Sequence, residues 1–193
     1  MKKLLKYIVL SIVSVGMLAG FTACGAKSDP VKDDLYNYLN EMETIQTIQQ
    51  QAINDYNSYV NDKESDSQEL LTALESNIIP NYENYISQLN ALAPVTEEVQ
   101  NVKAVCVNGA NKQLEALNKV VEAIKACDTN MLTEADILIG ESESIFADYE
   151  KQLSDLAAQH EIALVSSRTG AGASESSDDA SEDAGSDSEE ATE

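Results

Sequence analysis

The sequence predicts an all-α protein, an antiparallel up-down-up-down four-helix bundle, on three observations. Between residues 30 and 165 the apolar residues recur at intervals of three and four, which is the spacing of one helix face. Proline occurs only three times, at positions 30, 80 and 94, and glycine is scarce in this range. No segment alternates polar and apolar residues over the length of a strand. Four long helices joined by short loops favour antiparallel neighbours.

The first helix is predicted to begin at Asp29 and Pro30, because Asp caps helix N-termini and proline is favoured at the first helical position. One polar residue, Gln49, interrupts its apolar stripe. The other members of that stripe are Val31, Leu35, Tyr38, Met42, Ile45, Ala52, Tyr56 and Tyr59. At 1.5 Å per residue, a helix of about 30 residues is roughly 45 Å long.

The second helix opens on a capping box, formed either by Ser65 with Gln68 or by Asp66 with Glu69. Inside this helix, Pro80 removes a backbone hydrogen bond and predicts a kink or a restart. The helix ends before Pro94, and its stripe consists of Leu71, Leu74, Ile78, Tyr82, Tyr85, Leu89 and Leu92.

The third helix is predicted to start at Thr96, and the fourth at Thr133 with Asp136. The pair Asn108–Gly109 is a possible bend in the third helix, although apolar residues continue on both sides. The third stripe is Val99, Val102, Cys106, Ala110, Leu114, Leu117, Val121 and Ile124. The fourth is Leu138, Ile145, Tyr149, Leu153 and Leu156, with His160 near its end.

The chain divides into four parts. Residues 1–23 read as a signal peptide, 24–29 as a tether, 30–165 as the helical domain and 166–193 as a disordered Ser/Asp/Glu-rich tail. The tail has nine acids, one base and no large apolar residue, so it cannot bury enough surface to fold. Its glycines at 170 and 172 form a flexible linker. In an antiparallel bundle the tail emerges at the same end as the tether.

The charge balance excludes some partners. Removing three lysines with residues 1–23 leaves nine Lys/Arg against 34 Asp/Glu, a net charge of about −25. Nucleic acid requires a basic surface, so the sequence predicts no nucleic-acid partner. Acidic ligands are disfavoured, and an anionic membrane surface repels the chain. Cationic partners are allowed, but acidity points to none in particular.

The first residues are typical of an export signal. Three lysines stand within Met1–Lys6, and an apolar run follows over Tyr7–Met17. That run is shorter than the roughly 20 residues that a membrane-spanning helix needs, so a retained membrane helix is the second choice. After it, Phe21-Thr22-Ala23-Cys24 marks the end of the segment.

These four residues resemble the lipobox of bacterial lipoproteins, where Leu more often stands in place of Phe21. The resemblance implies cleavage before Cys24 and attachment of diacylglycerol, carrying acyl chains such as palmitate, to its sulfur. It places the protein at the extracytoplasmic face of the cell membrane. The signal, spacing and acidic tail are similar to those of helical lipoproteins of Gram-positive bacteria. Two acyl chains anchor a protein stably. The alternative is an ordinary signal peptide with an incidental Cys24.

The chemistry-bearing residues do not assemble into a catalytic set. Cys106 and Cys127 lie about 31 Å apart on one predicted helix, beyond the roughly 7 Å of a disulfide, so two free thiols are expected. His160 is expected at a partly buried edge of the fourth helix. The chain has one histidine, which excludes the Glu-x-x-His pairs of di-iron bundles. We expect no enzyme activity, cofactor or metal.

Two local patterns have competing interpretations. Asp62–Asp66 places oxygen ligands at alternate positions, as calcium loops do, but it lacks the glycine and the final Glu, so a solvated turn is favoured. Tyrosines occur in pairs at 36/38, 56/59 and 82/85, a pattern that also suits sugar stacking. In the predicted bundle these pairs lie at different levels, which favours packing over a single site.

Two functions follow from different features. The first is a lipid-anchored, non-enzymatic interaction or scaffold module that docks an unidentified protein of the cell envelope. The alternative is a ligand-binding accessory module, for example of a transporter, with a cavity near the Pro80 kink. A filled core and a long exposed apolar strip favour the first function. A pocket lined by polar side chains beside Ser76 favours the second. The sequence implies no specific small molecule.

Overall fold

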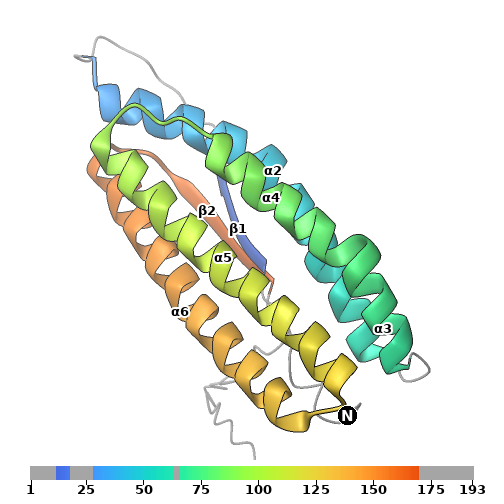
Figure 1. Cartoon of the computed structure of the whole chain (residues 1–193). Coiled ribbons are helices and arrows are strands. Elements are labelled where there is room, and N and C mark those ends of the chain that lie inside the picture. The colour runs from blue at the N-terminus through green and yellow to red at the C-terminus, as the bar shows by residue number, and fades with distance from the viewer. Residues whose placement is uncertain (1–11, 18–27, 63–65, 170–193) are drawn as a thin grey trace, which may run out of the picture.

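The computed structural model describes residues 12–17, 28–62 and 66–169. Four helical rods form an antiparallel bundle, so the predicted all-α architecture is confirmed (Figure 1). The helical elements are α2 (Pro30–Asn61), α3 (Ser67–Ala73), the π-helical turn η1 (Leu74–Ile78), α4 (Ile79–Ala91), α5 (Glu97–Ala126) and α6 (Thr129–Gln159). Since α3, η1 and α4 follow one another without a gap, they form a single rod, the second of the four.

The two ends of the bundle are distinct. The proximal end holds Asp29, the loop 92–96 between α4 and α5, and His160 after α6. The distal end holds the start of α3 and the turn 127–128 between α5 and α6 (Figure 1). With 32 residues, α2 is about 48 Å long and runs from the proximal end to the distal end. Cys24, the predicted lipid attachment site, and residues 170–193 of the predicted tail 166–193 lie outside the described residues.

Asp residues cap three of the helix starts locally, whereas Thr96 stands at the predicted start of α5 without a side-chain cap bond of its own. Asp29 accepts a hydrogen bond from the amide of Lys32 (3.1 Å). Of the two capping boxes predicted for the second rod, the structure forms the one between Asp66 and Glu69. The predicted start of the last helix at Thr133 and Asp136 is wrong. The helix begins at Thr129, because the earlier Asp128 already caps it by accepting from the Asn130 amide (2.8 Å).

Pro80 does not break its helix. The turn before it widens to a π turn, in which the Ile79 amide donates to the Leu74 carbonyl five residues back. This wider turn accommodates a residue that has no N–H to donate. Nor does Gly109 interrupt α5. It packs against Phe146 of α6, and a Cβ atom at that position would lie 3.0 Å from two ring carbons.

The core fills the space between all four rods. The predicted stripes of the first three helices are confirmed, except that Val31, Tyr59 and Leu114 are half-buried. In α6 the predicted Leu138 and Ile145 lie at the edge of the core. The sequence analysis missed several buried residues between α5 and α6. Five of them are small, Gly109, Ala116, Ala123, Ala135 and Ser142, and two are large, Ile139 and Phe146.

A short antiparallel strand pair was not predicted. It joins β1 (Ile12–Met17) to β2 (Leu164–Thr169), with Ile12 opposite Thr169 and Met17 opposite Leu164. Both strands run beside the helices in Figure 1. Because β1 lies inside the predicted signal peptide, removal of residues 1–23 would take this strand away.

Candidate functional site

The two described cysteines are free thiols, as predicted. Cys106 is buried, and burial raises the pKa of its thiol to about 12. Cys127 is exposed and ends α5 in the left-handed conformation, at φ 52°. A buried, neutral thiol is a poor nucleophile. Cys106 is therefore a core residue.

His160 lies at the edge of the bundle, as predicted, and closes its proximal end. Its Nδ1 atom is 2.7 Å from Oδ2 of Asp29, which joins the end of α6 to the start of α2. The hydrogen bond from His160 lowers the pKa of Asp29 below its ordinary value. This contact is structural, because Asp29 also caps α2.

Asp34, which the sequence analysis did not single out, is a buried carboxylate that caps α5. It accepts hydrogen bonds from the amides of Val95 (3.0 Å) and Thr96 (2.8 Å) and from the Thr96 hydroxyl (2.6 Å). Burial raises the pKa of Asp34, but these bonds outweigh it and leave the pKa below its ordinary value. No local pattern could have revealed this role, because the partners are about 60 residues apart in sequence.

The calcium-loop interpretation gains no support from the described residues. The Asp66 carboxylate accepts from the amides of Gln68 and Glu69, at 2.8 and 2.9 Å, and so serves as a helix cap. Residues 63–65 lie outside the described residues. Within the described ranges, no group of three or more His, Cys, Asp or Glu side chains is arranged to hold a metal ion.

The prediction that the tyrosines lie at different levels is wrong for two of them. Tyr38 and Tyr85, from different pairs, meet in the core with Tyr149 and Cys106. The hydroxyls of Tyr38 and Tyr149 are 3.3 Å apart, and the Tyr85 hydroxyl is 3.8 Å from the Cys106 sulfur. Burial raises the pKa of all three tyrosines well above the ordinary value. All three tyrosine side chains are buried and cannot stack on a sugar, so the packing interpretation holds for this cluster.

A polar pocket lies at the distal end, between α2 and the rod that contains η1. We call it the distal pocket; its volume is about 550 Å³, and its lining residues are Tyr59, Asp66, Gln68, Glu69, Thr72, Ala73, Ser76 and Asn77. This is the polar pocket beside Ser76 that the sequence analysis gave as the mark of a ligand-binding module. A second pocket of similar volume lies at the proximal end, beside Asp34 and the loop 92–96.

A chain of side-chain hydrogen bonds extends from the distal pocket along the groove between the two rods. The Asn77 amide donates to Asp55 on α2 (2.9 Å), and the Asn81 amide donates to Asn77 (2.9 Å). Gln51 donates to the other Asp55 oxygen (2.7 Å). These contacts fix the orientation of Asn77 at the pocket wall.

The lining of the distal pocket is rich in hydrogen-bond acceptors. The hydroxyls of Thr72 and Ser76 donate to backbone carbonyls of their own helix, at 2.9 and 2.7 Å, so their lone pairs are what they offer a ligand. Asp66 and Glu69 add carboxylate oxygens, and the lining contains no Lys, Arg or His. Such a pocket suits a ligand that donates hydrogen bonds and disfavours an anion.

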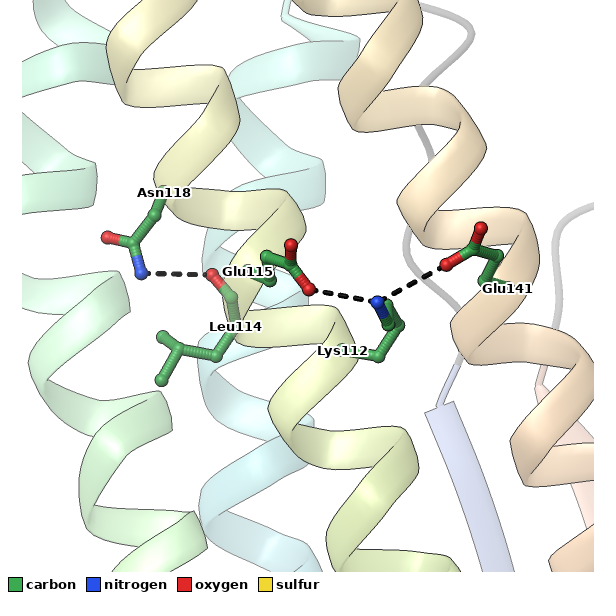
Figure 2. Close-up of polar contacts among 5 residues, drawn as sticks. All are labelled: Lys112, Leu114, Glu115, Asn118 and Glu141. Atoms are coloured by element: carbon green, nitrogen blue, oxygen red, sulfur yellow. Dashed lines mark hydrogen bonds and ion pairs between the residues drawn. The ribbon is translucent and has the colours of Figure 1, made fainter.

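The outer face of α5 and α6 carries a repeated pattern of ion pairs. Figure 2 shows Lys112 between Glu115 of its own helix (3.0 Å) and Glu141 of α6 (3.3 Å). Seven residues along α5, Lys119 lies between Glu122 (2.8 Å) and Glu134 (3.5 Å). Exposed pairs of this kind contribute little to stability, because water and salt screen them.

The described residues show no long exposed apolar strip. The large hydrophobic side chains with high exposure are Val95, 79% exposed in the proximal loop, and Ile137, 57% exposed near the start of α6. These two residues lie toward opposite ends of the bundle. The feature that would favour the docking function is therefore missing from the described part of the chain.

Comparison with known proteins identifies a family. A family model described as EMYY-motif containing lipoprotein matches residues 1–164. The letters Glu-Met-Tyr-Tyr do not occur consecutively in this chain, where Glu41-Met42 is followed by Glu43 and Thr44. No curated protein and no solved structure matches the chain. Within the described helices, none has an apolar stretch long enough to cross a membrane.

Proposed function

Because the chain belongs to the EMYY-motif containing lipoprotein family and is a bacterial lipoprotein, we propose that it is a ligand-binding module held by lipid at the outer face of the cell membrane. Cys24 is the attachment site in this proposal, since it follows the lipobox-like Phe21-Thr22-Ala23. The family membership supports membrane anchoring. The choice of Cys24 and of the extracytoplasmic face depends on the signal sequence.

The anchor orients the bundle in this proposal. Asp29 stands five positions after Cys24, a span of at most about 17 Å, so the proximal end stays near the membrane. The distal pocket lies at the other end of α2, about 45 Å further out. A ligand therefore meets the protein away from the anionic lipid surface.

The distal pocket is the observation that carries this function. It has polar lining beside Ser76, whereas the described surface has no apolar strip for a docking partner. Its carboxylates, Asp66 and Glu69, are engaged in the capping box, and the hydroxyls of Thr72 and Ser76 donate to backbone carbonyls, so we propose binding without catalysis. The ligand is cationic or neutral and donates hydrogen bonds. The scaffold function stays a prediction; the filled core is the feature that supports it.

Three probes of equal length test the pocket. We would add 1,5-diaminopentane, 1,5-pentanediol or glutarate to the mature chain, with Cys24→Ser so that it stays in solution, and follow backbone amide NMR signals. The diamine should shift the signals of Thr72, Ser76 and Asn77, the diol should do so more weakly, and glutarate should not. Shifts that are absent for both donor probes, or that appear equally with glutarate, would contradict the proposal.

Matched variants test whether the diamine binds in the distal pocket. Glu69→Gln removes a charge from the pocket and keeps the capping box, because Gln serves at that position as well as Glu. It should weaken diamine binding several-fold. Asn111→Ala, on the outer face of α5, should leave binding unchanged. Equal binding by wild type and Glu69→Gln would show that the diamine binds elsewhere.

A separate experiment tests whether Cys24 carries the lipid anchor. Cys24→Ala should block lipid attachment, so that the protein leaves the membrane fraction or persists as an uncleaved precursor. Cys127→Ser, a change of an exposed thiol in the distal turn, should leave the protein in the membrane fraction. Mature protein that stays membrane-bound in the Cys24→Ala variant would show that another feature anchors it.

A further inference from the structure

Four polar side chains form one layer in the middle of an otherwise apolar core, and each rod supplies one of them. They are Gln49 on α2, Tyr82 on α4, Gln113 on α5 and Ser142 on α6, with exposures of 1% or less. We call this set the central polar layer. It is independent of the distal pocket.

Contacts and register place the four side chains together. The Tyr82 hydroxyl donates to Oε1 of Gln113, and the Gln49 side chain lies beside the same hydroxyl. Ser142 follows from the α5–α6 register. The pairing that brings Gly109 against Phe146 and Lys112 beside Glu141 puts Gln113 level with Ser142.

Within the protein, some hydrogen-bond donors and acceptors of the central polar layer have no partner. Tyr82 has a single proton, and Gln113 receives it. The Gln49 amide makes a weak hydrogen bond to the Tyr82 hydroxyl that falls outside normal bond geometry, its amide oxygen has no partner, and the Ser142 hydroxyl has none. A buried polar atom without a partner costs a substantial part of the small net stability of a domain. Gln49 and Ser142, on different rods of the same layer, therefore each have a buried oxygen without a partner.

We propose that Gln49 and Ser142 form a binding site for internal water. Gln49 offers two donors and an acceptor, and Ser142 offers one donor and two acceptors, so the partner must both donate and accept. Water does so with two to four bonds in a small space. An ion is disfavoured, because no residue of the central polar layer is charged and its charge would stay uncompensated.

The water links α2 to α6. These two helices also meet through the hydroxyls of Tyr38 and Tyr149 and through Asp29 with His160. A bridge between Gln49 and Ser142 adds a third polar connection on the same side of the bundle, about midway along its length. The site holds its water for longer than the surface does, because every side chain in the layer is closed to solvent.

Oxygen-17 relaxation dispersion on the full chain with Cys24→Ser, which keeps β1 beside α2 and α6, tests the site, since it counts waters that exchange slowly with solvent. Wild type should show at least one such water per molecule. Gln49→Met keeps an unbranched side chain of similar length in the core and should lose that signal. Gln88→Met changes an exposed amide of α4 and should keep it.

The outcomes separate water from its alternatives. If Ser142 instead satisfies itself by donating to a carbonyl of its own helix, wild type will show no slow water. Equal dispersion in wild type and Gln49→Met would place the water elsewhere. Either result overturns the proposal. Far-UV circular dichroism of both variants confirms that the bundle is folded, and if Gln49→Met unfolds, Ser142→Ala with the same readout takes its place.

Discussion

The hairpin of α5 and α6 and the other half of the bundle, formed by α2 and the α3–η1–α4 rod, are built differently. In the hairpin, small residues stand at every seventh position of α5, at Gly109, Ala116 and Ala123. The ion pairs on its outer face repeat with the same period (Figure 2). This regularity brings the two helices close along their whole length.

The other half uses large side chains and departs from regularity. Tyr56, Tyr82 and Tyr85 fill it, and a π turn precedes Pro80. The hydroxyl of Tyr56 and the amide oxygen of Gln49 find no partner within the protein, and in the hairpin the Ser142 hydroxyl finds none. The distal pocket opens in the half formed by α2 and the α3–η1–α4 rod. The two halves therefore differ in degree: the hairpin packs more regularly, and the other half holds more departures from regularity.

The largest expected effect is alkaline destabilisation, which targets the buried thiol and tyrosines. Burial raises the pKa of Cys106 to about 12 and also raises those of Tyr38, Tyr82, Tyr85 and Tyr149. These groups keep their protons in the folded state and lose them on unfolding, at about pH 8.5 for a thiol and about 10 for a tyrosine. Their stabilisation is complete below those values and is lost as pH rises toward the folded-state pKa values.

Urea unfolding at several pH values measures this. The midpoint should stay nearly constant from about pH 7 to 8 and fall steeply above about pH 9. Cys106→Ala should move the start of the decline toward the ordinary tyrosine pKa. A midpoint that stays flat far above that value would show that the core tyrosines are not sealed from solvent.

The next effect concerns the junction between the two halves, where Asp34 of α2 caps α5. Asp34→Asn removes the charge and one acceptor from a site with three hydrogen bonds, and we expect a loss of about 2 kcal/mol in unfolding free energy. The neighbouring Asp33 is exposed, so Asp33→Asn should change it by less than about 0.5 kcal/mol. Chemical denaturation compares the two variants.

Acid should reproduce the effect of Asp34→Asn. The pKa of Asp34 is lowered in the folded state, so its stabilisation is complete above the ordinary Asp value and is lost as pH falls through the folded-state pKa. The variant should therefore lose less stability than wild type between neutral and acidic pH. Parallel pH profiles for the two proteins would show that Asp34 does not titrate with folding.

The sequence predicted the half with large apolar residues better than the hairpin. The stripe of the second rod, from Leu71 to Leu92, is buried throughout. In α6 the prediction chose Leu138 and Ile145, whereas Ile139 and Phe146 lie in the core. Small residues determine that register, and their weak hydrophobicity hides them from a pattern based on large side chains.

Candidate sites that depend on a local signal could be predicted from the sequence, whereas those that depend on contacts between rods could not. Pro80 is a local signal, and it led to the expectation of a polar pocket beside Ser76. The cap by Asp34 and the central polar layer depend on contacts between different rods. Gln49 was visible as a polar exception in its stripe, but its partners across the bundle were not.

The close packing of the hairpin can be tested at one glycine with another as control. Gly109→Ala would set a methyl group 3.0 Å from two ring carbons of Phe146, and overpacking should outweigh the gain in helix propensity, for a net loss of about 1–2 kcal/mol. At Gly140 of α6 an added methyl group would meet no atom within 4 Å, so Gly140→Ala should gain up to about 1 kcal/mol. Adding Phe146→Leu to Gly109→Ala should recover part of the loss. Similar gains in unfolding free energy at both glycines would show that α5 and α6 are not closely packed at Gly109.

The smallest effect lies at the end of α5, where the hairpin turns. Cys127 has φ 52°, a left-handed conformation that a side chain disfavours and glycine does not. Cys127→Gly should therefore raise the unfolding free energy by about 0.5–1 kcal/mol, in spite of the greater freedom of glycine in the unfolded chain. Ala126→Gly, one residue earlier and still helical, should lower it by about the same amount. Opposite signs at adjacent positions would establish that backbone conformation determines the result. If both substitutions destabilise, the Cys127 side chain, whose sulfur lies 3.7 Å from the Ile124 carbonyl oxygen, stabilises the turn more than its backbone strain costs.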